Sequence, residues 1–192
     1  MKTKILTLFT LLAMAAVSHG QFINKGAILA GGGLEFKSQK EDSSKDKLTQ
    51  FSVMPWVGYT VINNLVVGAG VQLGYAKAEA SSGTFEASQT ELLFAPLVRY
   101  YLNQGVFFHG QFGLGSSKGK FTSGSSTSES KSSLVQIKAG AGYAVKIGES
   151  ALFEPMVGFI SEASKSDVSG SSTVTNAGFF GMMTFTVFLK RP

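Results

Sequence analysis

The sequence predicts an all-β fold, an eight-stranded antiparallel up-and-down transmembrane β-barrel preceded by a signal peptide. Three observations predict it: a short apolar segment at the N-terminus, apolar residues that recur at every second position afterwards, and connections that alternate between short and long. Period two is the repeat of a β-strand, whose side chains point alternately to the two faces of a sheet. The chain beyond its first twenty residues is therefore interpreted as strands.

The first twenty residues have the organisation of a secretory signal. Two lysines precede an apolar run from Ile5 to Val17, and small residues follow it. This run is shorter than the roughly 20 residues that a helix needs to cross about 30 Å of hydrocarbon. We expect residues 1–20 to be removed as a signal peptide, and residues 21–192 to form one outer-membrane β-barrel domain.

The composition argues against several classes of function. The chain has no cysteine, so it holds no disulfide, no thiol nucleophile and no thiolate metal site. Its net charge of +5 falls to +3 when the two lysines of the signal leave. This small excess, without a clustered basic face, argues against nucleic acid as a partner.

The one histidine outside the signal, His109, is the remaining candidate for chemistry. A single histidine cannot build a two-histidine metal site, and a general base needs a nucleophile and an orienting group beside it. Ser116 and Ser117 are too far along the same predicted strand to serve. We therefore expect no catalytic residue, no metal and no cofactor, and predict that the protein is not an enzyme.

Eight stretches of the mature chain carry the period-two pattern. They are Lys25–Lys37, Leu48–Val61, Leu65–Glu79, Gln89–Leu102, Val106–Ser117, Ser133–Ile147, Ala151–Ser164 and Thr175–Leu189. Three short connections join them, at Asn63–Asn64, Asn103–Gly105 and Gly148–Ser150, and consist of residues that favour tight turns. The four long connections are Ser38–Lys47, Ala80–Ser88, Lys118–Ser132 and Lys165–Val174. This alternation predicts an even-stranded barrel with both termini on the periplasmic side.

The connection Lys118–Ser132 is the longest and is strongly polar. We interpret it as a solvated surface loop, with a specific binding surface as the alternative.

The two faces of the predicted strands indicate which side points inward. In Ser133–Ile147 one face carries Val, Ile, Ala and Tyr, whereas the other carries Gln, Lys, Gly and Ala. A soluble sandwich would bury the apolar face and expose charged or hydroxylated residues on the other. Here the second face is instead rich in the small residues Gly and Ala. Eight strands enclose an interior just wide enough for side chains, so small and polar residues fit inside and apolar ones face lipid.

Aromatic residues near the short turns fall on the apolar face. We predict that they form a belt at one membrane interface, where aromatic rings prefer the headgroup level, although strand propensity alone also enriches them. These interface aromatics are Tyr59, Tyr100, Phe108, Tyr143 and Phe153.

Three segments share a pattern that begins with proline and ends with an aromatic residue: Pro55–Tyr59, Pro96–Tyr100 and Pro155–Phe159. With them, residues 21–192 resemble the small outer-membrane β-barrel domain proteins of the OmpX, OmpW and OmpA-barrel type, often labelled porin family. The resemblance implies the outer membrane of a Gram-negative bacterium, with outer-membrane lipid and the barrel-assembly machinery as partners. Because proline has no N–H, we expect a bulge or a missing ladder bond at each of the three prolines.

The inward face also carries four acidic and four basic residues. Unpaired charges are costly in a narrow lumen, so we predict a mutually paired network, with a charge-lined solute pathway as the alternative. The predicted network consists of Glu35, Lys37, Glu91, Arg99, Lys138, Lys146, Glu154 and Glu162.

The sequence thus predicts a non-enzymatic outer-membrane barrel with a largely plugged polar lumen, serving envelope integrity or surface interaction with an unidentified extracellular ligand. The alternatives are a small-solute pore or transporter and a lipid-modifying enzyme.

Overall fold

The structure is a computed structural model that describes residues 22–40, 47–79, 85–123, 126–167 and 172–190. The predicted signal peptide lies outside the described residues. Nine strands form one antiparallel sheet: β1 (Ile28–Lys40), β2 (Lys47–Ile62), β3 (Leu65–Glu79), β4 (Phe85–Tyr101), β5 (Val106–Ser123), β6 (Ser126–Tyr143), β7 (Val145–Ile147), β8 (Ala151–Ser166) and β9 (Thr173–Lys190). Among the described residues, no helix is long and apolar enough to cross a membrane.

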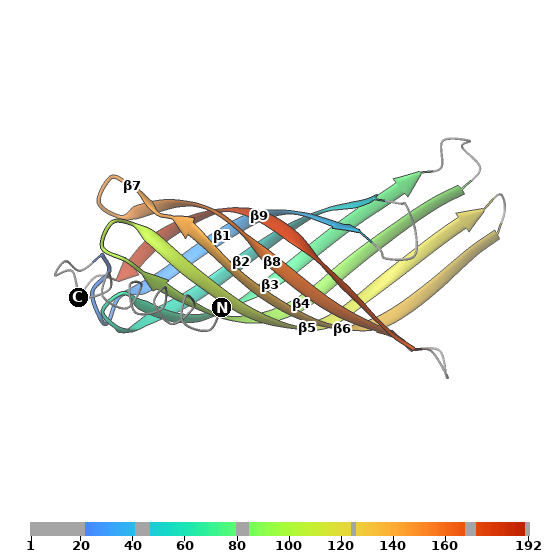
Figure 1. Cartoon of the computed structure of the whole chain (residues 1–192), viewed down its shortest axis with the longest axis horizontal. Coiled ribbons are helices and arrows are strands. Elements are labelled where there is room, and N and C mark those ends of the chain that lie inside the picture. The colour runs from blue at the N-terminus through green and yellow to red at the C-terminus, as the bar shows by residue number, and fades with distance from the viewer. Residues whose placement is uncertain (1–21, 41–46, 80–84, 124–125, 168–171, 191–192) are drawn as a thin grey trace, which may run out of the picture.

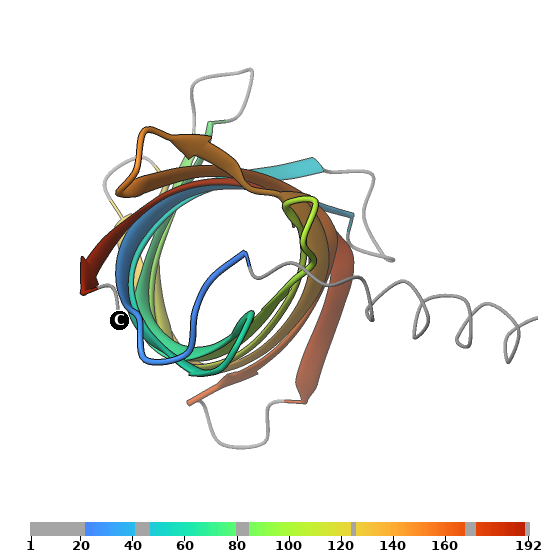
Figure 2. The same cartoon turned by 90° about the vertical axis from the view of Figure 1, so that its left-hand side faces the viewer.

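The sheet closes into a ring. Each strand from β1 to β6 pairs with the next, β6 pairs with β8, β8 with β9, and β9 with β1. The short strand β7 continues along β8 where β6 stops, so the ring has eight walls. Figure 1 shows the strands inclined to the long axis, and Figure 2 looks into the ring. The predicted antiparallel barrel is confirmed.

The two ends of the barrel differ. The turn end, as we call it, holds the three short connections and the ends of β1 and β9 that lie nearest the two termini. The opposite end, called the hairpin end, holds the connections β1–β2, β3–β4, β5–β6 and β8–β9. The three short connections lie at the turn end as predicted, and three of the four hairpin-end connections are longer, but only two residues separate β5 from β6.

The break between β6 and β7 has a local cause. The register of the β6–β8 ladder is the same on both sides of it, since Gly142 pairs with Met156 and Val145 pairs with Phe153. Two residues of β8 lie between these pairs, Glu154 and Pro155, and Pro155 has no N–H to donate. Ala144, the residue between β6 and β7, donates its N–H to the carbonyl oxygen of Gly105 at 2.7 Å and not to β8.

The other two prolines interrupt their ladders in the same way. The β2–β3 pairing stops at Val53 and resumes at Trp56, on either side of Pro55. The β4–β5 pairing stops at Phe94 and resumes at Leu97, on either side of Pro96. The register does not change across any of these gaps. Of the two expected outcomes, a missing ladder bond therefore applies at each proline, and a bulge does not.

The connection predicted at Lys118–Ser132 is mostly a β-hairpin, and the prediction of a loop is wrong. β5 and β6 stay paired from Lys118 opposite Lys131 to Ser123 opposite Ser126. The prediction failed because this stretch has no apolar face, whereas backbone pairing does not require one. β8 pairs with β6 only from Ser132 onward, so the β5–β6 hairpin extends past its neighbour, as Figure 1 shows.

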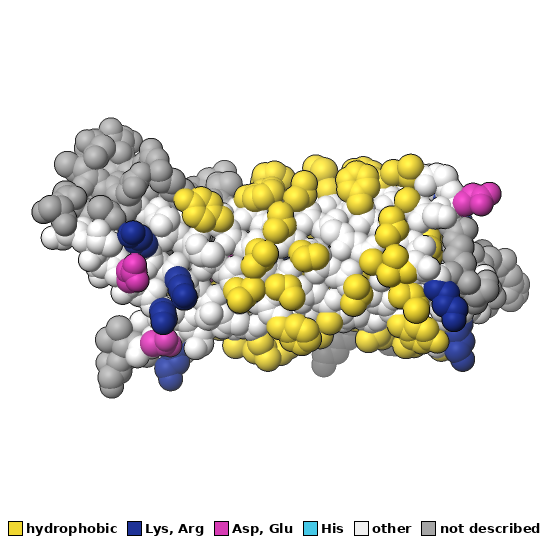
Figure 3. All heavy atoms as spheres, turned by 180° about the vertical axis from the view of Figure 1, so that it is seen from behind, with side chains coloured by type: hydrophobic (Ala, Val, Ile, Leu, Met, Phe, Trp, Pro, Cys, Tyr) yellow, Lys and Arg dark blue, Asp and Glu magenta, His cyan; other side chains and the backbone are white. Residues whose placement is uncertain are grey.

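Side chains alternate across the wall as the sequence predicts. Small residues face inward where strands approach closely: a Cβ on Gly68 would overlap the backbone carbonyl of Val57, and one on Gly158 that of Ala139. Large apolar side chains face outward, and Val157 and Phe159 are 70% and 64% exposed. On the face drawn in Figure 3, hydrophobic side chains occupy the middle and charged ones lie near the two ends.

Candidate functional site

The lumen is the candidate functional site, because the inward positions of all eight walls converge there. Six of the eight residues predicted for the charge network are buried inside it: Glu35, Glu91, Arg99, Lys138, Glu154 and Glu162. Lys146 is exposed at the turn end. The backbone of Lys37 is paired in β1, but its side chain lies outside the description.

The first group of polar contacts surrounds Glu154 on β8. Its Oε2 accepts hydrogen bonds from Arg99 Nη1 at 2.7 Å and from Thr186 Oγ1 at 2.5 Å. Its Oε1 accepts one from the hydroxyl of Tyr101 at 2.6 Å. The Arg99 guanidinium also lies over the Trp56 ring, 4.5 Å from the centroid, which is a favourable cation–π distance. Both charges of this buried pair are thus compensated.

The second group surrounds Lys138 on β6. Its ammonium donates to Glu35 Oε2 at 2.5 Å and to Gln72 Oε1 at 2.8 Å. Ser52 Oγ donates to Glu35 Oε1 at 3.3 Å. The ammonium also lies 5.5 Å from the centroid of the Phe180 ring. Glu35 and Lys138 are 103 residues apart in sequence, so the closed ring brings them together.

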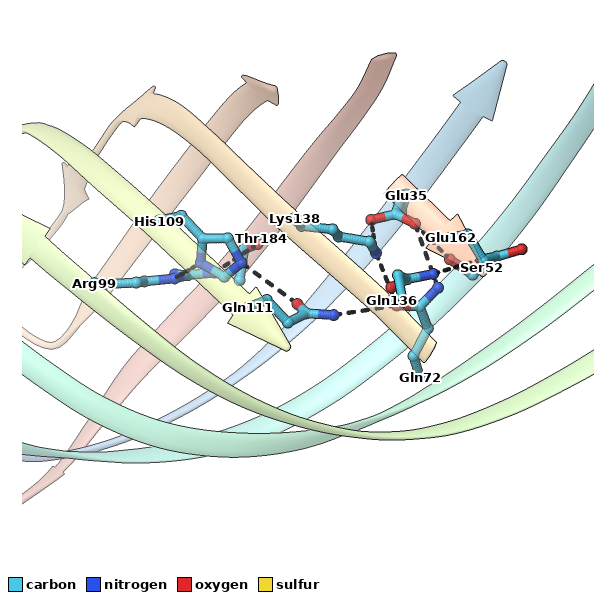
Figure 4. A network of polar contacts seen from close by, with 10 residues as sticks. All are labelled: Glu35, Ser52, Gln72, Arg99, His109, Gln111, Gln136, Lys138, Glu162 and Thr184. Carbon is cyan, nitrogen blue, oxygen red and sulfur yellow. Dashed lines mark hydrogen bonds and ion pairs between the residues drawn. The ribbon is translucent and has the colours of Figure 1, made fainter. Parts of the chain in front are cut away.

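His109 and Gln111 join the two groups. Arg99 Nε donates to His109 Nδ1 at 3.2 Å, which assigns the ring proton to Nε2. Nε2 lies 3.4 Å from Gln111 Oε1, and Gln111 Nε2 donates to Gln72 Oε1 at 3.4 Å. Figure 4 shows this continuous chain of contacts. The network lies in the lumen, where His109 contacts the side chains of Arg99 and Gln111.

The remaining two carboxylates contact amide side chains. Gln89 Nε2 donates to Glu91 Oε1 at 3.1 Å, and Gln136 Nε2 donates to Glu162 Oε2 at 2.8 Å. Glu91 and Glu162 lie in the part of the lumen nearer the hairpin end. In the described ranges, no three His, Cys, Asp or Glu side chains are arranged to hold a metal ion.

The turn end also contains a plug that was not predicted from the sequence. The residues that precede β1, Phe22–Ala27, turn into the barrel mouth, and we call them the N-terminal plug (Figure 2). Ile23 is 2% exposed and belongs to the apolar core of the barrel. The Phe22 ring stacks on Tyr101 at 5.7 Å and 11°. The sequence did contain an indication of the plug, because Phe22 and Ile23 are adjacent apolar residues that do not fit the alternating pattern.

Lys146 belongs to this mouth and not to the charge network. Its ammonium lies 4.6 Å from the centroid of the Phe22 ring. Together with Glu149 it lines a cavity of about 620 Å³ between the N-terminal plug and the β7–β8 turn. The sequence pattern placed Lys146 on the inward face, but the wall ends there and its side chain meets solvent.

The five predicted interface aromatics all lie on the outward face near the turn end. Three of them, Tyr59, Phe108 and Tyr143, are exposed, and Tyr100 and Phe153 are half-buried. The Phe153 ring packs against Phe185 of β9, with the centroids 5.0 Å apart. Their role at a membrane interface stays a prediction.

Comparison with known proteins gives the same architecture. Neisserial surface protein A superposes with a TM-score of 0.55 and 14% identity, over 85% of this chain and 99% of that one. Ail, the attachment invasion locus protein of Yersinia pestis, gives 0.58 and 17%, over 84% and 99%. The β domain of the Bordetella autotransporter BrkA gives 0.52 and 12%, over 84% and 69%.

These identities are low enough that the likeness concerns the fold alone. No curated protein matches the sequence. The family described as outer membrane protein beta-barrel domain matches residues 5–154. The chain therefore belongs to the outer membrane protein β-barrel family.

Proposed function

We propose that this protein is a non-enzymatic outer-membrane barrel with a closed lumen that binds an anionic polymer at the cell surface. In this arrangement the termini are periplasmic and the hairpin end faces outside. The buried charge network supports the closed lumen, because Arg99 pairs with Glu154 and Lys138 pairs with Glu35 across the interior. The observation that carries the proposal is the part of the β5–β6 hairpin that extends past β8, residues 118–123 and 126–131, which we call the protruding sheet.

The protruding sheet carries basic side chains on its outward face. Lys118 lies directly opposite Lys131 in the β5–β6 ladder, a like-charge pair that destabilises a sheet unless an anion lies nearby. Glu129 is opposite Lys120, and Asp167 lies next to Lys131 through a backbone hydrogen bond. Three lysines of the protruding sheet are exposed, Lys118, Lys120 and Lys131, and Lys165 of β8 is exposed beside it, so positive charge exceeds negative charge among the side chains described there.

A protein of similar fold supports the choice of ligand. Ail has been crystallised in complex with the heparin analogue sucrose octasulfate, a small polyanion. The identity of 17% to this chain transfers no binding residue. The lysines of the protruding sheet supply the matching chemistry independently, since ammonium groups attract sulfate and phosphate groups.

Retention on immobilised heparin tests this proposal. The purified barrel in detergent micelles is compared with a double variant, Lys118→Gln with Lys131→Gln. We expect the wild type to be retained and the variant to elute at lower salt, because two of its cationic contacts are lost and the attraction is screened by salt.

The matched control changes two exposed lysines at the opposite end, Lys25→Gln with Lys190→Gln. This control has the same net charge as the test variant, so net charge alone predicts the same elution for both. A wild type that passes through the column, or equal losses in both double variants, would contradict binding at the protruding sheet.

A further inference from the structure

The N-terminal plug lies in the mouth of the turn end, on the turn-end side of the charge network. We propose that this segment is a gate, held shut by Asn64, that controls access from the turn end to the space below the network. The proposal goes beyond surface binding, which concerns the opposite end of the barrel. It rests on the contacts that hold residues 22–27 in the mouth.

Asn64 is the residue that holds the plug. Its Oδ1 accepts two backbone hydrogen bonds, from Phe22 N at 2.8 Å and from Ile23 N at 2.9 Å. Its own N–H donates to the Ile23 carbonyl at 2.9 Å. Asn64 has φ of +69°, a left-handed conformation that asparagine tolerates better than most residues. The β2–β3 turn is thus shaped to present this side chain to the plug.

Asn64 also connects the plug to the rest of the mouth. Its Nδ2 donates to Asn103 Oδ1 in the β4–β5 turn at 3.2 Å, and its carbonyl accepts from the N–H of Tyr101 at 2.8 Å. Asn103 and Tyr101 both belong to a neighbouring wall, so one side chain ties three segments together. Loss of the Asn64 side chain releases the N–H groups of Phe22 and Ile23, whereas the backbone bonds of Gly26 and Ala27 with Thr60 still hold the base of the plug against β2.

The plug and the network meet at one side chain. Tyr101 stacks on Phe22 on one side and donates its hydroxyl to Glu154 on the other. The plug is otherwise bounded by apolar core residues and by the cavity that Lys146 and Leu152 line. Opening the plug therefore exposes Leu152 while the network above still closes the lumen.

Thiol accessibility tests the gate, since the chain has no native cysteine. Leu152→Cys is the reporter on the turn-end side of the network, and Leu93→Cys on β4 is the reporter nearer the hairpin end. Both leucines are at most 1% exposed. The reagent is a charged, membrane-impermeant methanethiosulfonate, added to the barrel in detergent micelles. In the Leu152→Cys background, Asn64→Gly should raise the labelling rate about tenfold or more, because two hydrogen bonds to the plug are lost.

Glycine keeps the positive φ that the turn requires, so the substitution removes the side chain without straining the backbone. The comparison variant is Asn63→Gly, which removes one hydrogen bond to the plug, from the exposed N–H of Lys25, and should raise the rate less than Asn64→Gly does. A second variant, Phe22→Ser, removes the stacking on Tyr101 and should act as Asn64→Gly does.

Two results would overturn the gate. One is an unchanged rate at Leu152→Cys in both Asn64→Gly and Phe22→Ser, which would mean that the plug does not limit access. The other is an equal rise at Leu93→Cys, which would mean that the whole barrel loosens. A gel-migration difference between boiled and unboiled samples checks that each variant still forms a closed barrel.

Discussion

The lumen and the outer wall are built from the same strands but differ in the kind of change they tolerate. On β6, Ile137 is 57% exposed on the outer wall, and its neighbour Lys138 is 1% exposed in the lumen. Outward side chains meet a uniform apolar solvent, so any apolar residue of suitable size serves there. Inward side chains each need a particular partner, because an unpaired charge inside the ring has no solvent to replace it.

The largest effect should come from breaking a lumen pair. Arg99→Leu leaves the buried carboxylate of Glu154 without its cation and should lower the free energy of unfolding by about 3–5 kcal/mol. Denaturant titration of the barrel in lipid vesicles measures the change. The double variant Arg99→Leu with Glu154→Gln should recover part of the loss, since no charge is then left alone. A harmless Arg99→Leu would show that the lumen is hydrated.

A smaller loss should follow from placing a charge on the outer wall. Ile137→Arg should cost about 2–4 kcal/mol if this position lies near the bilayer midplane. The control is Leu189→Arg at the turn end, where an arginine reaches the interface and should cost about 0–1 kcal/mol. Titrations in the same vesicles compare the two. Equal costs at the two positions would mean that the outer wall is not graded by membrane depth.

The smallest effect should come from Lys146, which was predicted to belong to the charge network but lies in the mouth of the barrel. Lys146→Gln removes only an exposed contact with the Phe22 ring and should change stability by less than about 1 kcal/mol. The paired variant Lys138→Gln leaves the buried Glu35 carboxylate without its cation and should cost several times more. Similar losses in the two variants would erase the distinction between the mouth and the lumen.

Much of the barrel follows from local sequence. Strand β3 spans Leu65–Glu79, the range predicted from the alternating pattern. The pattern ends at Ser117 for β5, yet the strand continues to Ser123. Beyond the apolar band both faces meet the same surroundings, so hydrophobicity stops alternating while the backbone ladder continues.

The candidate site was predictable only as a set of residues. The alternation of side chains along each strand placed four of these residues on the inward face, and the structure shows them buried: Glu35, Arg99, Lys138 and Glu154. The same alternation placed Lys146 on the inward face, but this residue lies at the turn end, where its side chain is exposed. The bridging role of His109 and Gln111 was not predictable, because it depends on how far each side chain reaches across the ring.

The sequence by itself determined which residues share a face, because a strand alternates its side chains whatever it pairs with. It also determined where ladder bonds would be missing, since proline lacks an N–H in any fold. Only the tertiary structure decided that Lys138 meets Glu35 and that Arg99 meets Glu154, because these pairs form only when the strands close into a ring with a particular register. The N-terminal plug has the same origin: Phe22 and Ile23 find their place only after the turn carrying Asn64 lies beside the open mouth.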